Sequence, residues 1–204
     1  MNIENLRIDG ARLWSSLMAM AKIGATPKGG CNRQALTDDD QKGRDLFIEW
    51  CTQAGCNVRV DAMGNLFARR PSRDESLSPI VAGSHLDTQP TGGKFDGVYG
   101  VLAGLEVVRA LNDAKQTTHR PLELVVWTNE EGSRFSPAMV GSGVWSGEFS
   151  LEYGHSRTDK DGVSIGEELK RLGYLDQVSV IEKDVAAAFE LLIEQGPILE
   201  DEGL

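Results

Sequence analysis

Two clusters of polar residues, each following an apolar segment, hold the side chains best able to do chemistry in this sequence. His85 and Asp87 open the first cluster, a glycine-rich loop leads from them to Asp96, and Glu130 and Glu131 form the second. A neutral imidazole binds zinc well, and a nearby carboxylate such as Asp87 can hold its other nitrogen. Asp96 could add an oxygen ligand or bridge two metals, and Glu131 could bind a second metal. Glu130 would then be free to act as general base toward water.

The apolar segments before the two clusters predict the strands that position them. Residues 80–84 and 122–128 are short and apolar, and residues 97–114 between them have the spacing of a buried helix. Strand, helix and strand in this order indicate a right-handed crossover and a parallel pair. Ligands of such sheets bind beyond the carboxyl ends of the strands, so we expect both clusters to meet there. The predicted fold is α/β, with a mostly parallel sheet covered by helices.

The remaining segments predict further elements around this unit. Asp9 and Thr37 are N-cap candidates for two helices, and Ser164 with Glu167 forms a capping-box pattern. Other segments predict a hairpin, a short helix, a polar loop and a last strand at residues 57–70, 141–149, 150–163 and 186–194. The other two histidines, His119 and His155, are expected at the surface.

Composition excludes several classes of function. The 204 residues suffice for one sizeable core or for a domain plus a fragment of another. The net charge of −10 disfavours nucleic acid and anionic membranes as partners, because both select clustered lysine and arginine. No apolar run has the length of a membrane span, and the N-terminus lacks the pattern of a signal peptide. Three cysteines without a CxxC pair suit a reduced, cytoplasmic protein.

Several motifs taken together resemble one enzyme family. They are the loop at residues 33–40, residues 83–97 (GSHLDTQPTGGKFDG), residues 128–135 (TNEEGSRF) and residues 193–197 (IEQGP). The set resembles the carbamoylase-type amidohydrolases of the di-zinc aminopeptidase/aminoacylase superfamily. These include N-carbamoyl-L-amino-acid hydrolases, zinc-type β-ureidopropionase and allantoate amidohydrolase.

The resemblance implies a role for each residue of the two clusters. It implies two zinc ions, with His85 as ligand to one metal, Glu131 as ligand to the other, and Asp96 as the bridge. Manganese, nickel or cobalt would also suit a set of histidine and carboxylates. Glu130 is implied as the general base and Asp87 as the acid that orients the ligands.

The resemblance also implies a reaction and a substrate. Metal-activated water would cleave a linear C–N amide bond in the carbamoyl or ureido group of an N-carbamoyl-L-amino acid or an allantoate-like compound. Gln195 is implied as a residue that contacts this small-molecule substrate.

The sequence departs from the family pattern in two respects. Leu192 stands where the family has one histidine ligand, and a last histidine ligand of the family is expected in the part that would follow residue 204. Each metal is therefore expected to be one ligand short of the usual three. The family is homodimeric, and we expect residues 1–204 to be an incomplete catalytic domain without the lid and dimerisation domain. Apolar surface should then be exposed around residues 195–204. The alternative to an active enzyme is therefore a truncated, inactive fragment or a pseudo-enzyme subunit, with weak metal binding or an empty site.

Overall fold

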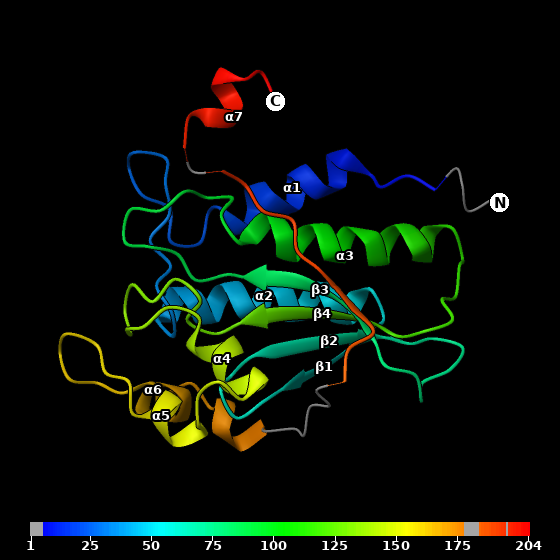
Figure 1. The fold of residues 1–204 in the computed structure, drawn as a ribbon. Coiled ribbons are helices and arrows are strands. Elements are labelled where there is room, and N and C mark those ends of the chain that lie inside the picture. The colour runs from blue at the N-terminus through cyan, green and yellow to red at the C-terminus, as the bar shows by residue number, and fades with distance from the viewer. Residues whose placement is uncertain (1–5, 178–183, 195) are drawn as a thin grey trace.

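A computed structural model describes residues 6–177, 184–194 and 196–204, and shows one open five-stranded sheet with helices packed against it (Figure 1). The α/β fold class predicted from the sequence is confirmed. No helix within these described ranges is long and apolar enough to cross a membrane. The elements are α1 (Gly10–Met20), α2 (Asp38–Gln53), β1 (Asn57–Val60), β2 (Leu66–Arg70), β3 (Ile80–His85), α3 (Val98–Asp113), β4 (Leu122–Trp127), α4 (Val140–Ser146), α5 (Leu151–His155), α6 (Ile165–Arg171), a 3₁₀ helix (Tyr174–Gln177), β5 (Ala187–Phe189) and α7 (Ile198–Asp201).

The strands lie in the order β1-β2-β4-β3-β5. The predicted crossover is confirmed, because β3 pairs in parallel with β4 and α3 connects them. β5 adds a second parallel pairing on the other side of β3. The predicted hairpin of β1 and β2 is also confirmed, but β2 docks antiparallel beside β4. The sheet is therefore mixed, and the expectation of a mostly parallel sheet holds only for β3, β4 and β5, since a hairpin reverses its second strand.

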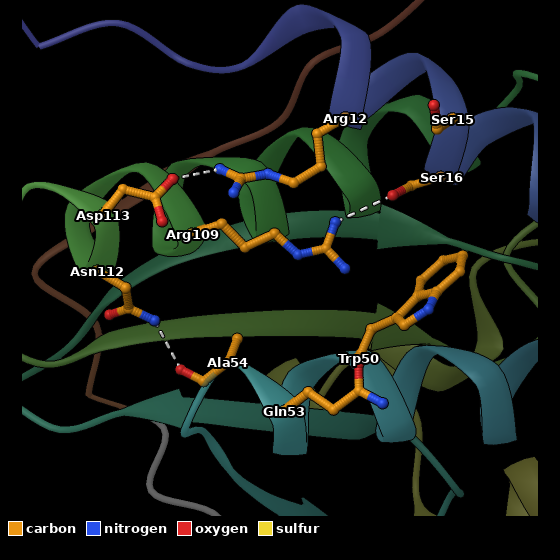
Figure 2. Close-up of a pocket in the computed structure, with 9 residues that line it drawn as sticks. All are labelled: Arg12, Ser15, Ser16, Trp50, Gln53, Ala54, Arg109, Asn112 and Asp113. Carbon is orange, nitrogen blue, oxygen red and sulfur yellow. Dashed lines mark hydrogen bonds and ion pairs between the residues drawn. The ribbon is translucent and has the colours of Figure 1, made fainter.

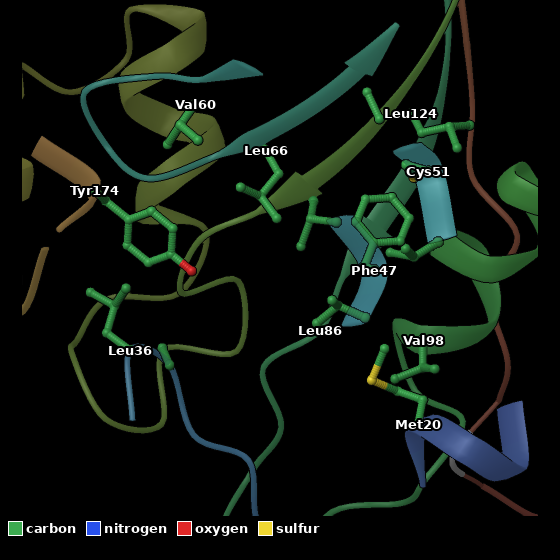
Figure 3. Close-up of a cluster of buried hydrophobic side chains, with 14 of the residues drawn as sticks. Met20, Leu36, Phe47, Cys51, Val60, Leu66, Leu86, Val98, Leu124 and Tyr174 are labelled. Carbon is green, nitrogen blue, oxygen red and sulfur yellow. The ribbon is translucent and has the colours of Figure 1, made fainter. Parts of the chain in front are cut away.

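The two faces of the sheet are packed differently. Alternate residues of β2 and β4, including Leu66 and Leu124, join the main core together with residues of α1, α2 and α3 (Figure 3). The intervening residues Phe67 and Val125 point to the opposite face, where they pack with tryptophans including Trp145 of α4. This separation follows from the two-residue period of a strand. The helices thus cover mainly one face of the sheet.

The structure confirms the predicted helix starts and corrects two other segments. Asp9, Thr37 and Ser164 each accept a hydrogen bond from a backbone amide in the first turn of the helix that follows. Residues 150–163 are not entirely loop, because Ser150 caps the short helix α5. The strand predicted over residues 186–194 is shorter than expected, since only Ala187–Phe189 pair with β3. A strand at the edge of a sheet has a neighbour on one side only, so fewer hydrogen bonds hold its ends.

Candidate metal centre

The ends of β3 and β4 bring three predicted metal ligands together. His85 is the last residue of β3, Asp96 lies in the loop before α3, and Glu131 lies in the loop after β4. One ligand atom from each of these residues lies within 4.8 Å of the other two. Within the described residues, this is the group of histidine, cysteine and carboxylate side chains that could hold a metal ion. It lies beyond the carboxyl ends of a parallel strand pair, where the sequence predicted it.

The imidazole of His85 is buried, and an oxygen atom lies near each of its two nitrogens. Nδ1 lies 2.8 Å from the backbone oxygen of Asp87, and Nε2 lies 3.4 Å from Oε2 of Glu130. A proton on Nδ1 would be donated to that carbonyl and would leave Nε2 free to bind a metal. Burial lowers the pKa of His85, but the carboxylates of Asp87 and Glu130 outweigh burial and raise it. Gly97 packs against the face of the ring, because a Cβ there would lie 2.5 Å from three ring atoms.

The carboxylate of Asp87 joins the two clusters. It is fully buried and accepts hydrogen bonds from the backbone amides of Glu130 and Glu131, each at 3.2 Å. Its nearer oxygen is 4.0 Å from Nδ1 of His85, so the Asp87 backbone oxygen, rather than its carboxylate, makes the short contact with the imidazole. Burial raises the pKa of Asp87 to about 6, although the nearby His85 acts to lower it. Asp87 therefore fixes the peptide that carries both glutamates.

The carboxylates of Asp96 and Glu131 lie close enough to disfavour two full negative charges. Burial and the neighbouring Asp96 raise the pKa of Glu131, while a hydrogen bond from Gln89 lowers it. Gln89 donates from Nε2 to Oε2 of Glu131 at 3.0 Å. A bound cation would relieve this repulsion, so the donor set fits a metal such as zinc. The sequence reasoning did not assign Gln89, although its position two residues after Asp87 could have suggested it.

The strap, which we define as residues 184–194, pairs with β3 and then crosses α3 (Figure 1, orange to red), and none of its residues belongs to the group of possible metal ligands. Its last paired residue is Phe189, opposite Ala82. Beyond Phe189 the strap leaves the sheet and packs on α3, because a Cβ on Gly100 would lie 2.8 Å from the backbone oxygen of Leu191, and Leu192 is 71% exposed. Glu190 accepts a hydrogen bond from the buried Ser84 at 2.5 Å, which fixes the strap against β3. Gln195, the predicted substrate contact, lies outside the described residues.

The other two histidines lie away from the centre. His119 is exposed, as expected. His155 is only half-buried rather than fully exposed, because α5 brings its Nε2 to 2.7 Å from the backbone oxygen of Ala62.

A separate polar cleft of about 470 Å³ lies between α1, α2 and α3 (Figure 2). Arg12, Trp50 and Arg109 line it; Arg12 forms ion pairs with Glu106 and Asp113, and the guanidinium of Arg109 lies over the ring of Trp50. The α3 residues that line it, Arg109 to Asp113, are 11 to 15 residues from the start of that helix at Val98. At 1.5 Å per residue they lie roughly 16–22 Å along the helix from its first residue, which follows the loop of Asp96. The cleft therefore shares no residue with the predicted site.

Comparison with known proteins identifies the class to which this fold and site belong. Residues 81–204 match peptidase family M20/M25/M40, and the chain belongs to that family. An N-carbamoyl-L-amino-acid amidohydrolase of Rhizobium meliloti is 55% identical over 98% of this chain and 48% of its own length. A ureidoglycolate hydrolase of Arabidopsis thaliana is 34% identical over 98% of this chain and 44% of its own length.

Solved structures show the same likeness. The crystal structure of an amidase of the hydantoinase/carbamoylase family from Burkholderia multivorans is 62% identical, with a TM-score of 0.93. The match covers 97% of this chain and 48% of that structure. The resemblance to the carbamoylase type is therefore confirmed, and the chain spans about half the length of the relatives it matches.

Proposed function

We propose that this chain carries the metal-binding and catalytic residues of an amidohydrolase that cleaves the linear C–N bond of a carbamoyl or ureido group. The observation that carries the proposal is the convergence of His85, Asp96 and Glu131 beside the carboxylate of Glu130. Likeness to N-carbamoyl-L-amino-acid amidohydrolases and ureidoglycolate hydrolases supports this substrate class. N-carbamoyl-L-amino acids are the first substrates to test, and allantoate-like compounds are the second.

The residues divide into ligands, a base and a support. His85 would hold one metal, Glu131 the other, and Asp96 would bridge them. Zinc, when bound, would supply a Lewis acid that polarises the substrate carbonyl and favours deprotonation of water. Glu130 is partly exposed, does not belong to the ligand triad and would accept the proton of the attacking water at its carboxylate. Asp87 would orient both glutamates through their backbone amides.

The reaction consumes one water for each C–N bond broken. Attack of water on the carbamoyl carbon breaks its bond to the amino-acid nitrogen, and Glu130 would return its proton to that nitrogen as it leaves. The carbamic acid released would then yield carbon dioxide and ammonia. Gln195 stays a proposed substrate contact.

We also propose that the chain is an incomplete catalytic domain to which a lid and dimerisation domain would attach. Support comes from apolar side chains that are exposed in the strap and after it. Those in the strap are Phe189, Leu191, Leu192 and Ile193, and those in the expected range 195–204 are Ile198, Leu199 and Leu204. Exposed apolar patches of this kind mark interaction surfaces. The same exposure, together with the missing ligand at position 192, favours an inactive fragment or pseudo-enzyme subunit as the second candidate.

The substitution Leu192→His tests which candidate is correct. Because Leu192 stands where the family has a histidine ligand, a histidine there would add a ligand, and we expect zinc to bind at least about tenfold more tightly, or about 1.4 kcal/mol. Leu191→His is the matched control, because neighbouring residues of an extended segment point to opposite sides. Zinc affinity and ammonia release from N-carbamoyl-L-amino acids would be measured for both variants and the wild-type chain.

A second substitution tests the assigned base. Glu130→Gln should keep zinc binding and lower ammonia release by about 10²–10⁴-fold, the usual contribution of a general base. Zinc binding without ammonia release in all chains would favour the inactive candidate. Equal zinc affinity of Leu192→His, Leu191→His and the wild type would contradict the ligand argument.

A further inference from the structure

Asn129 occupies an unusual place directly before the two glutamates of the proposed metal centre. It lies two residues after Trp127, the last residue of β4, is fully buried, and has a backbone φ of +55°. Asparagine tolerates this left-handed conformation better than most residues with a side chain. The turn at Asn129 therefore directs the chain out of the sheet and into the loop that carries Glu130 and Glu131.

The side chain of Asn129 closes this loop on itself. Its Nδ2 donates to the backbone oxygens of Phe135 at 2.7 Å and Pro137 at 3.3 Å. The backbone amide of Met139 donates to the oxygen of Glu130 at 2.7 Å, which fixes the same loop from its far side. Asn129 therefore closes the loop through its side chain, and Asp87 holds the amides of Glu130 and Glu131. Both residues fix the same short peptide.

The side chain at position 129 must be a hydrogen-bond donor. Both partners of Asn129 are carbonyl oxygens, and its own Oδ1 is buried without a hydrogen-bond partner among the described residues. An aspartate has nearly the same shape, but its carboxylate would face two carbonyl oxygens with no hydrogen to donate. A glycine would keep the positive φ and remove only the carboxamide.

We propose that Asn129 is a positioning residue that holds the Glu130–Glu131 peptide in the geometry of the metal centre. In this geometry the backbone amides of Glu130 and Glu131 reach Asp87. The side chain of Glu131 reaches Asp96, and the carboxylate of Glu130 faces His85. The proposal deepens the proposed function, because its consequence for metal binding rests on the assignment of Glu131 as a ligand. Its consequence for the loop itself is independent of any metal.

The experiment compares Asn129→Asp and Asn129→Gly with Val108→Ala in the full 204-residue chain. Val108 is buried in α3, away from the loop, so its truncation destabilises the core without touching the metal centre. Zinc affinity is expected to fall by about 10–100-fold in the Asn129 variants, as for other residues that orient metal ligands. Val108→Ala should keep the wild-type affinity. Asn129→Asp should lose more zinc affinity than Asn129→Gly. If Asn129 had a packing role alone, the nearly isosteric aspartate would be the milder change.

Amide hydrogen exchange at Glu130 and Glu131, measured by NMR without metal, separates this proposal from the proposed function. Loss of protection in Asn129→Asp, but not in Val108→Ala, is expected even if the wild-type chain binds no zinc. In that case the metal assignment fails while the positioning role stands. Wild-type protection and wild-type zinc affinity in both Asn129 variants would overturn the proposal, as would equal effects in Val108→Ala.

Discussion

Replacement of Gly97 by alanine is a direct test of how His85 is positioned. Gly97 precedes α3 with a φ of +66° and a ψ of −46°, a conformation that residues with a side chain rarely adopt. An added Cβ would lie 2.5 Å from Nδ1, Cε1 and Cδ2 of His85, so it would press on the face of the imidazole. The substitution therefore perturbs one proposed ligand without changing any ligand atom.

The structure indicates the size of the effect. An ordinary contact of this kind is 3.4 Å or longer, so the ring or the backbone must retreat by roughly 0.9 Å. Metal sites tolerate ligand displacements of only about 0.2 Å, so we expect zinc affinity to fall by about 10–100-fold. The backbone conformation alone should lower the free energy of unfolding by about 1–3 kcal/mol.

The assay is a zinc titration in competition with a chromogenic chelator, followed by urea unfolding in the presence of EDTA. Gly55→Ala is the control, because Gly55 also has a positive φ, +81°, but an added Cβ would meet no atom within 4 Å. Gly55→Ala should lose stability and keep zinc affinity. Equal zinc affinities for the two variants would refute the contact argument, because the effect would then follow from destabilisation alone.

Three further predictions concern stability and thiol chemistry. Arg44→Met should lower the free energy of unfolding by about 3–5 kcal/mol, because it leaves the carboxylate of Asp40 buried without its partner. The double variant with Asp40→Asn should recover part of this loss, and a urea series in which it recovers nothing would contradict the reasoning. Burial raises the pKa of Cys51 and raises that of Cys56 to about 11, so both thiols should react with Ellman's reagent at pH 8 only after unfolding. Rapid reaction of the native chain would contradict this. Ser164→Ala should lower the free energy of unfolding by about 1 kcal/mol through loss of the capping box, as measured by thermal unfolding.

Most of the elements could be predicted because their signals are local. Caps at Asp9, Thr37 and Ser164 and the apolar periods of the strands and of α3 depend on neighbours within a few residues. The parallel pairing of β3 with β4 followed from the helix between them. Local signals were weaker at the C-terminal end, where only three residues of a predicted nine-residue strand pair with β3.

The sequence by itself determined which residue types gather at one edge of the sheet, because strand order and direction place both clusters there. Only the tertiary structure decided which atoms meet. It placed the Asp87 carboxylate on the amides of the two glutamates, and brought the carboxamide of Gln89 to Glu131. These contacts join residues far apart in the chain, and side-chain directions across packed loops depend on distances and angles that no local pattern of residues records.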